Sequence, residues 1–357
     1  MPDSGENNLD KLPVPRLAAG EVPVISLFCG AGGLDHGFDS AGFRTIFAAD
    51  SMQAAVSSFN HNANADIATV LDLLSTSSAD IAKAVHKRIV LAGASPRGLI
   101  GGPPCQGVSN ANNQSGPEDP RNRLFARYSN IVLDLDKTFG LDFFVFENVP
   151  GLKAAKNKPL YDTLKKKLGK AYELHEAILD ASKFGVPQTR RRLIIVGISK
   201  RLKGADFQFP VPAENAEVPT VKGAIGGLPE PIFFARGASG GDRATHVNHW
   251  TMAPKSKKFS DSAALKDGRS FIRLEWDAPS RTVAYGNREI HVHPSGTRRL
   301  SIYEALRLQG FPKSFELLGN LSEQVTQVSN AVPPPVAAAV ARSIAAALGR
   351  ARILTPE

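Results

Sequence analysis

The sequence predicts an α/β protein with a mostly parallel sheet and helices on both of its faces. Short apolar segments alternate with helical stretches through the first half of the chain. A strand, a glycine turn and a helix follow one another in "VPVISLFCGAGGLDHGF" (22–38), and strand then helix recur in "FRTIFAADSMQAAVSSF" (43–59). Three more apolar segments are typical of buried strands, namely "GLIGG", "DFFVFENVPG" and "RRLIIVGI".

Length and cysteine usage narrow the class of protein. The chain has 357 residues, which is enough for two structural parts. Its two cysteines, Cys29 and Cys105, provide neither a disulfide framework nor a four-ligand zinc set, so we expect a reducing, intracellular compartment. The N-terminus lacks the pattern of a signal peptide, and no run reaches about 18 uninterrupted apolar residues. We therefore expect a soluble, cytoplasmic protein with no membrane partner.

The charge of the chain favours a polyanionic partner. Its net charge is +9 and its isoelectric point is about 9.5. Residues 243–313 contain 13 lysines and arginines against 6 acidic residues, so a net +7 lies in about a fifth of the chain. An ordinary solvated basic face would give the same count, and charge alone does not distinguish the two.

Several polar or glycine-rich positions directly follow apolar segments. They are the glycine turn at 30–33, Asp50, Cys105 and Glu147. Ligands of open α/β sheets bind at the carboxyl ends of the strands, so we expect these positions to converge in one crevice. The turn and Asp50 resemble a dinucleotide fingerprint, but Asp35 stands where the third glycine belongs. The pattern therefore argues against NAD and leaves other adenosine-bearing cofactors open.

Cys105 begins a long polar loop in "IGGPPCQGVSNANNQSGPEDPRNRLF" (100–125). A small buried residue is the usual role of a free cysteine, and that role does not explain the loop. A nucleophile that is covered only after its substrate has bound would explain both features. Cys29 lies inside the glycine turn instead, and we expect it to be a packing residue.

Six segments occur in an order that resembles the principal motifs of the DNA cytosine-5 methyltransferases. They are "SLFCGAGGLDHGF", "GGPPCQGVSN", "FENVPGL", "FGVPQTRRRLIIVG", "RRLSIYEALRLQGFP" and "QVSNAVPPPVAAAV". The resemblance covers roughly residues 24–205 and 276–348. It implies a Rossmann-like S-adenosylmethionine-dependent methyltransferase domain with a smaller inserted target-recognition domain. It also implies methyl transfer from S-adenosylmethionine to C5 of a flipped-out cytosine in a specific duplex sequence, with S-adenosylhomocysteine as the product.

The resemblance implies a catalytic set of four residues. The Cys105 thiolate would add to C6 of the base, which makes C5 nucleophilic. Glu147 would grip N3 and the exocyclic amine, with its pKa raised by desolvation when the loop closes. Arg190 and Arg192, on one face of an expected strand, would hold the flipped base, while Arg191 would point the other way.

The resemblance also implies a set of cofactor-binding residues. Phe28 would face the adenine, Asp50 the ribose and Asp72 the adenine amine, and Leu124 would close the pocket. The remaining members of the set are Gly30, Gly32, Gly33, Pro103, Asn330 and Val332. The family usually has glycine where this chain has Ser329, which would be strained only if that position required a positive φ.

The domain boundaries and DNA contacts follow from the same comparison of motifs. We expect a disordered tail over 1–20, a catalytic domain over 21–205 plus 319–357, and a target-recognition domain with its hinge over 206–318, called the inserted region below. A helix after "VPPPV" would pack back on the catalytic domain through Val336, Val340, Ile344 and Leu348. The expected DNA-binding residues are Gln106, Ser109, Arg281, Thr282 and Val283.

The expected partner is double-stranded DNA, and a cognate restriction endonuclease could act on the same site without contacting the protein. We expect a monomer and no metal, although His246, His249, His291 and His293 are spaced in pairs. Two alternatives stay open: a tRNA cytosine-5 methyltransferase of the same fold, and a non-catalytic DNA-binding homologue. The sequence does not predict which DNA sequence is recognised.

Overall fold

The computed structural model describes residues 16–104, 123–213, 217–234, 245–255, 259, 272–282, 291–350 and 352–353. The expected α/β fold is confirmed by a seven-stranded sheet with the order β3-β2-β1-β4-β5-β8-β6. Its strands are β1 (Val22–Leu27), β2 (Phe43–Asp50), β3 (Ala68–Val70), β4 (Gly98–Gly101), β5 (Phe143–Asn148), β6 (Tyr172–Asp180) and β8 (Arg191–Ser199). All pairings in this sheet are parallel except those of β8, which runs antiparallel to both β5 and β6.

Helices cover both faces of the sheet. The helices of the described chain are α1 (Gly33–Asp39), α2 (Gln53–Ala63), α3 (Ser78–Ala92), α4 (Arg123–Phe139), α5 (Lys158–Leu168), α6 (Val221–Ile225), α7 (Ile302–Leu308), α8 (Leu321–Asn330) and α9 (Pro334–Arg350). Short 3-10 turns span η2 (Pro150–Lys153), η3 (Ala155–Asn157) and η4 (Ala181–Phe184). One apolar core joins α3, α4 and α5 to the sheet, and a second joins α1 and α9 to its opposite face.

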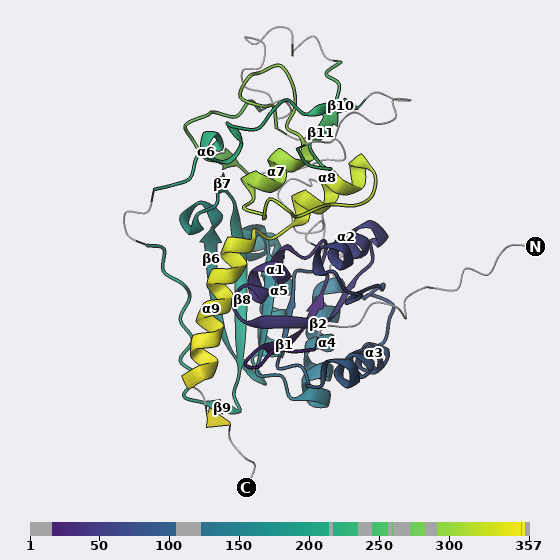
Figure 1. Cartoon of the computed structure of the whole chain (residues 1–357). Helices are drawn as coiled ribbons and strands as arrows, with labels where there is room; N and C mark the ends of the chain where they lie inside the picture. The colour runs from purple at the N-terminus through teal and green to yellow at the C-terminus, as the bar shows by residue number, and fades with distance from the viewer. Residues whose placement is uncertain are drawn as a thin grey trace, which may run out of the picture.

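Helix α9 returns the end of the chain to the sheet, as Figure 1 shows in yellow. The expected stripe of Val336, Val340, Ile344 and Leu348 is confirmed, because all four side chains are buried in the second core. Residues 321–349, which span α8 and α9, are long and apolar enough to cross a membrane. However, 67% of the 18-residue segment that meets this criterion is buried inside the protein. This composition is accounted for by core packing.

The inserted region shares an apolar core with α8, which follows it in the chain, and with Ala31 of the glycine turn. Helices α6, α7 and α8 contribute Val221, Ile225, Leu306, Val325 and Val328 to one apolar cluster. These elements lie above the sheet in Figure 1, together with the short parallel pair β10 (Ile232–Phe234) and β11 (Trp250–Met252). Helix α8 contacts both α7 and α2, so it touches elements on both sides of the predicted boundary at 318 and 319.

Two further short pairings tie distant segments together. Strand β12 (Ser280–Arg281), from the inserted region, runs parallel to β7 (Gln188–Thr189). Near the end of the described chain, β13 (Arg352–Ile353) runs antiparallel to β9 (Leu202–Lys203). The first pairing brings the segment "SRT" next to the beginning of β8.

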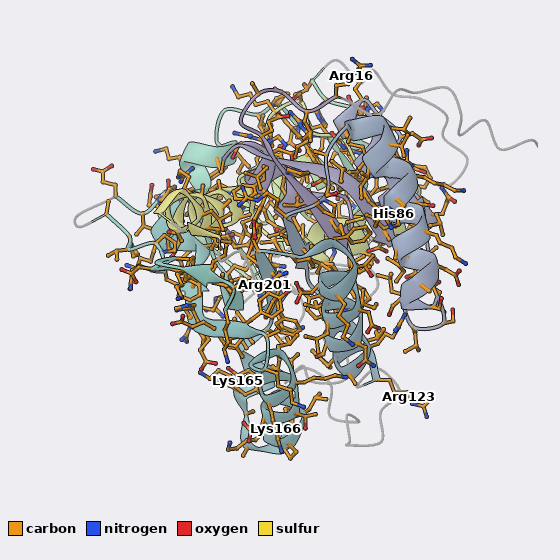
Figure 2. The ribbon with its side chains drawn as sticks, turned by 90° about the horizontal axis from the view of Figure 1, so that it is seen from below. Arg16, His86, Arg123, Lys165, Lys166 and Arg201 are labelled. Atoms are coloured by element: carbon orange, nitrogen blue, oxygen red, sulfur yellow. The ribbon has the colours of Figure 1, made fainter. Side chains whose placement is uncertain are left out.

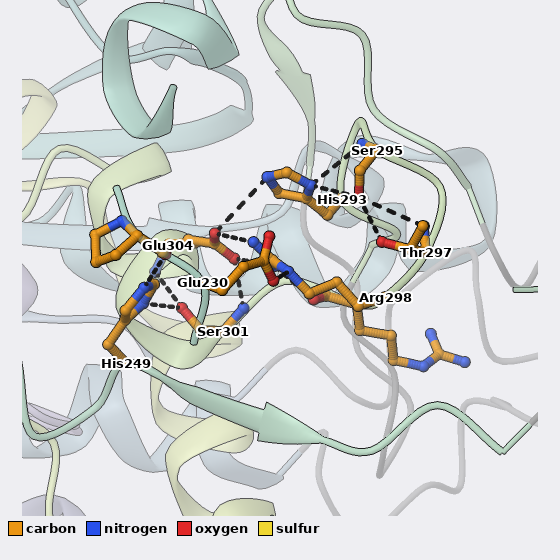
Figure 3. A network of polar contacts seen from close by, with 10 residues as sticks. Glu230, His249, His293, Ser295, Thr297, Arg298, Ser301 and Glu304 are labelled. Atoms are coloured by element: carbon orange, nitrogen blue, oxygen red, sulfur yellow. Dashed lines mark hydrogen bonds and ion pairs between the residues drawn. The ribbon is translucent and has the colours of Figure 1, made fainter. Parts of the chain in front are cut away.

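A buried ion pair stabilises the base of the inserted region (Figure 3). Arg298 donates two hydrogen bonds to Glu304, each of 2.9 Å, and a third of 2.7 Å to Glu230. Ser301 and Glu304 form a capping box at the start of α7. Ser301 also lies 2.9 Å from Nδ1 of His249, whose Nε2 lies 2.7 Å from the Pro229 carbonyl oxygen. Both ring nitrogens of this histidine are therefore engaged within the fold.

Basic side chains also occur on α5, away from the inserted region. Figure 2 views the molecule from below and shows Lys165 and Lys166 on this helix. Lys153 and Lys165 share one carboxylate, that of Glu176, at 2.8 and 2.9 Å. Burial alone would raise the pKa of Glu176, but the hydrogen bonds that it accepts lower its pKa to about 2. Part of the lysine charge on this face is therefore compensated locally.

Close packing of α1 on α9 depends on Gly37. A Cβ added there would lie 2.4 Å from Cβ of Ala337 and 2.5 Å from the Pro334 carbonyl oxygen. We expect Gly37→Ala to lower the free energy of unfolding by about 1–3 kcal/mol, because the two helices would have to separate. Urea denaturation followed by circular dichroism measures the change.

Gly349 provides the matched control on α9, since a Cβ there would meet nothing within 4 Å. Gly349→Ala should be neutral or stabilise by up to about 0.5 kcal/mol. Equal effects of the two substitutions would contradict the close helix contact.

Candidate active site

A cavity of about 300 Å³ opens at the carboxyl ends of β1, β2, β4 and β5. This is the edge of the sheet where the sequence predicted a crevice. Most of the predicted residues that the structure describes meet there. Those lining it are Phe28, Gly30, Gly33, Asp50, Pro103, Glu147, Arg192, Asn330 and Val332.

Asp50 holds the glycine turn in place. Its Oδ2 accepts a hydrogen bond of 2.9 Å from the Gly30 amide, and its Oδ1 accepts one of 2.9 Å from the Met52 amide. Burial raises the pKa of Asp50, and these amide hydrogen bonds act in the opposite direction. A carboxylate has about four acceptor positions, so Asp50 can also accept hydrogen bonds from a ligand in the cavity.

The turn requires unusual backbone conformations at and after the end of β1. Gly30 and Gly32 have φ values of 54° and 93°, in the left-handed region that favours glycine. Phe28 has φ of 55°, although a bulky residue rarely adopts this conformation. Phe28 lines the cavity, and the centroid of its ring lies 6.5 Å from that of Tyr128. The strained backbone thus places an aromatic residue at the cavity.

Cys29 lies in the same turn but packs as expected. It is buried in a small apolar cluster with Val56 and Phe59. Burial raises the pKa of the Cys29 thiol well above its usual range, and the charges of Asp50 and Asp35 add to the effect. A neutral thiol is a poor nucleophile, so Cys29 has the character of a core residue.

Glu147 and Arg192 form a buried ion pair on the other side of the cavity. Strands β5 and β8 pair antiparallel with Glu147 opposite Ile194, so Glu147 and Arg192 are diagonal neighbours on the same face of the sheet. Nε of Arg192 lies 2.9 Å from Oε1 of Glu147, and the side chains are 14% and 9% exposed. Burial raises the pKa of Glu147 even though both Arg192 and Arg190 lower it.

Gly102 is a site residue that the sequence analysis missed. It lines the cavity, and a Cβ added there would lie 2.6 Å from Oε2 of Glu147. The absence of a side chain therefore leaves room for the carboxyl group. The repeated glycine in "GGPPC" was the available signal, because a glycine that needs no positive φ marks close approach of another group.

Arg190 and Arg192 do not share one role in the structure. Arg190 is 1% exposed and does not belong to the cavity lining. Its Nη2 donates to the carbonyl oxygens of Ser329 and Ala331 at 2.7 and 2.8 Å, on either side of Asn330. Arg192 lines the cavity, and Arg191 is exposed, as expected. Arg190 therefore fixes the backbone of the segment that carries Asn330.

Ser329 is accommodated without strain. It lies within α8, and its hydroxyl donates to the carbonyl oxygens of Val325 or Thr326, at 2.8 and 3.1 Å. Among the described non-glycine residues, only Phe28 and Asn64 have positive φ. The departure from the family pattern at this position is therefore harmless to the backbone.

Three of the predicted cofactor residues, Asp72, Leu124 and Gly32, do not belong to the cavity lining. Asp72 is exposed and accepts hydrogen bonds from the Leu74 amide and the Ser75 hydroxyl, at 2.9 and 2.7 Å. Leu124 lies at the start of α4 and is only half-buried. Gly32 shapes the turn, where a Cβ would lie 2.9 Å from the Phe59 ring, but it does not line the cavity itself.

Four predicted site residues, Cys105, Gln106, Ser109 and Val283, lie outside the described residues. Pro103 and Pro104 both line the cavity, and Cys105 is the next residue in the chain. Arg281 pairs with Thr189 in the β7–β12 ladder, and the Thr282 hydroxyl donates to the Thr189 carbonyl oxygen at 2.6 Å. The inserted region is thus attached next to Arg190. The described residues contain no cluster of three potential metal ligands.

Known proteins resemble the chain over most of its length. Residues 22–346 match the model of the C-5 cytosine-specific DNA methylase family. The chain is 33% identical over 348 residues to Type II methyltransferase M.MthTI of Methanothermobacter thermautotrophicus, a match that covers 90% of this chain and 97% of that protein. It is 31% identical over 345 residues to Type II methyltransferase M1.HphI of Haemophilus parahaemolyticus, covering 90% and 86%.

Solved structures agree with this relationship. A candidate DNA modification methyltransferase encoded within a prophage (E. coli) superposes with a TM-score of 0.73 at 26% identity, covering 92% of this chain and 100% of that one. The S. pombe Dnmt2 methyltransferase superposes with a TM-score of 0.61 at 16% identity, which shows the fold alone. With the family model matched over nearly the whole sequence, the chain belongs to the C-5 cytosine-specific DNA methylase family.

Proposed function

We propose that the protein transfers a methyl group from S-adenosylmethionine to C5 of a cytosine that it flips out of duplex DNA, through a covalent bond between Cys105 and C6. The observation that carries this proposal is the buried Glu147–Arg192 pair, which faces the same cavity as Asp50 and the glycine turn. Pro104 brings the chain to that cavity one residue before Cys105. A cofactor side and a base side therefore share one cavity.

The residues on one side of the cavity fit S-adenosylmethionine, the methyl donor of this family and fold. The Asp50 carboxylate has acceptor capacity left for ribose hydroxyls, and the Phe28 ring offers a face for stacking on adenine. Asn330 and Val332, which lie near the C-terminal end of the sequence, line the same side of the cavity. When bound, the cofactor supplies an activated methyl group, and S-adenosylhomocysteine is left as the product.

The residues on the other side fit a cytosine ring. The Cys105 thiolate would form a bond to C6, and the electron pair displaced from the C5–C6 double bond would make C5 an enamine carbon that attacks the methyl group. Glu147 would hydrogen-bond or protonate N3, and Arg192 would hold the Glu147 carboxyl group in place. Loss of the C5 proton to solvent water, return of any N3 proton to Glu147 and release of the thiolate from C6 would then restore the aromatic ring.

The raised pKa of Glu147 supports its role as the proton donor. Burial disfavours the carboxylate and raises the pKa of Glu147, while the charges of Arg192 and Arg190 act in the opposite direction. A donor whose pKa lies nearer to the working pH is more effective than an ordinary exposed glutamate.

The inserted region is proposed to bind the duplex. Its basic excess favours phosphate contacts, and the attachment of Arg281 and Thr282 beside the catalytic strand favours contacts near the flipped base. The base must leave the helix because its C5 atom is inaccessible within the stack. We also propose that the protein acts as a cytoplasmic monomer, and that any cognate restriction endonuclease acts on the same DNA site without direct contact.

Radiolabel transfer tests the proposed reaction. We expect tritium from S-adenosylmethionine to enter unmethylated duplex DNA and not tRNA, and bisulfite sequencing of DNA from expressing cells to map the target. Cys105→Ser should reduce turnover to less than about a hundredth of wild type, because covalent catalysis contributes several powers of ten. Its affinity for S-adenosylhomocysteine should be unchanged.

A duplex with 5-fluorocytosine at the mapped target adds a direct probe of the covalent step. Fluorine cannot leave as a proton does, so a stable protein–DNA adduct is expected with wild type and not with Cys105→Ser. Label in tRNA instead of DNA would favour the RNA-methylating alternative, and duplex binding without any transfer would favour the non-catalytic one.

The different positions of Arg190 and Arg192 predict different effects of substituting them. Arg190→Lys cannot reach both the Ser329 and Ala331 carbonyl oxygens, so we expect the Kd for S-adenosylhomocysteine to rise about tenfold, as calorimetry would measure. Arg192→Lys, the matched control, should lower turnover about tenfold or more and leave this Kd within about threefold. The opposite pattern would show that the two roles are assigned the wrong way round.

Glu147→Gln separates proton transfer from binding. Glutamine keeps the shape and hydrogen-bonding capacity of Glu147 but cannot deliver a proton, so turnover should fall by about 10² to 10⁴. Affinity for S-adenosylmethionine should stay within about threefold, and 2-aminopurine fluorescence at the target should still report base extrusion. Normal turnover would remove Glu147 from the catalytic set.

A further inference from the structure

Three consecutive residues, Glu316, Leu317 and Leu318, form a strap between the inserted region and the cofactor cavity. Instead of pairing with another strand, each of them binds side-chain groups through its backbone. These partners come from α2, from α8 and from the inserted region. Such polar side chains are costly to bury unless all their hydrogen bonds are made.

Two asparagines form hydrogen bonds with the backbone of the strap, one from α2 and one from the inserted region. Asn62 of α2 accepts from the Glu316 amide at 2.9 Å and donates to the Glu316 carbonyl oxygen at 2.7 Å. Asn248 of the inserted region does the same for Leu317, with 2.8 Å for each bond. One strap residue is thus held by the catalytic side, and the next by the inserted region.

Helix α8 completes the connection through two buried glutamines. Gln324 accepts the second hydrogen bond that Nδ2 of Asn248 donates, at 3.1 Å, and itself donates to the Gly319 carbonyl oxygen at 2.8 Å. Gln327 donates to the Leu318 carbonyl oxygen at 2.9 Å and accepts from the Ser58 hydroxyl at 2.6 Å. These side chains are 6% and 3% exposed. Helix α8 is therefore bonded to both sides of the strap.

The same helix forms part of the cofactor cavity. Thr326, Gln327, Ser329 and Asn330 all line it. Figure 1 shows α8 between the inserted region above and α2 below. A displacement of Asn248 would consequently be transmitted through Gln324 to a helix that forms the cavity wall.

We infer that Asn248 is a positioning residue that couples DNA binding by the inserted region to cofactor affinity. Asn248 is 1% exposed, and its backbone carbonyl oxygen also accepts from the Tyr303 amide of α7 at 2.9 Å. Its side-chain amide donates to both Leu317 and Gln324 and accepts from the Leu317 amide, so these bonds favour one placement of the inserted region over α8. DNA that favours this placement also favours the cavity shape that binds the cofactor, and the coupling is reciprocal. The inference rests on the cofactor side of the cavity proposed above.

The test compares S-adenosylhomocysteine affinity with and without DNA in Asn248→Asp. The substitution keeps the acceptor for the Leu317 amide but loses both donated hydrogen bonds, to Leu317 and Gln324. In wild type, a duplex carrying the target mapped by bisulfite sequencing should tighten the Kd about fivefold or more. In the variant this ratio should fall below about twofold, while the Kd without DNA stays within about threefold of wild type.

Asn60→Asp is the matched control on α2. Asn60 donates to Asp66 and Ala68 and accepts from two amides, but it does not touch the strap. Asn60→Asp should lower stability and keep the wild-type ratio. If Asn248→Asp does not fold, Gln324→Leu tests the same link, because it removes the α8 side chain that accepts from Asn248.

The inference is overturned if Asn248→Asp or Gln324→Leu keeps the full wild-type ratio, or if DNA does not change cofactor affinity in wild type. Methyl transfer by the wild-type protein is measured in parallel. If DNA does not change cofactor affinity in the wild-type protein but the protein still methylates DNA, only the role of Asn248 is contradicted. If the wild-type protein transfers no methyl group, the proposed function is contradicted.

Discussion

The site depends on one feature of the sheet topology. Successive strands are first added on one side of β1 and then, from β4 onward, on its other side. From β1 the sheet grows through β2 and β3 on one side, and from β4 through β5 on the other. Connections after β1 and β4 therefore leave toward opposite faces and open a crevice between the two strand ends. The glycine turn follows β1, Asp50 ends β2, "GGPPC" follows β4 and Glu147 is in β5. A single topological feature thus brings the cofactor side and the base side together.

Close backbone approach allows so many groups to share one cavity. Gly33 would place a Cβ 2.5 Å from the Val332 carbonyl oxygen, and Gly102 would place one against the Glu147 carboxyl group. Two contacts hold the C-terminal part of the chain at the cavity. Arg190 donates hydrogen bonds to the carbonyl oxygens on either side of Asn330, and α9 packs on α1. The buried carboxyl group of Glu147 is less stable as an anion than one in water, and this same property suits it to proton donation.

The strands and most of the cavity residues could be predicted, because apolar segments end where the chemical motifs begin. The predicted residues that lie outside the cavity lining do so for local reasons. Asp72 follows the short edge strand β3 and accepts a hydrogen bond within its own turn, and no pattern in the sequence indicates which way its side chain points. Arg190 precedes the first residue of β8, so strand alternation does not place it on the face of Arg192. The strap could not be predicted from the sequence. Its contacts with Asn62 and Asn248 join residues that are 254 and 69 positions apart, and no local sequence pattern indicates such contacts.

The central claim is that the crevice at the strand reversal binds the cofactor and the target base side by side, and a crystal structure with S-adenosylhomocysteine tests it most directly. The ribose hydroxyls should lie within about 3 Å of the Asp50 carboxylate, the adenine against Phe28, and the sulfur on the side of the Glu147–Arg192 pair. A ligand whose ribose lies away from Asp50, or whose sulfur faces away from Glu147, would contradict the account.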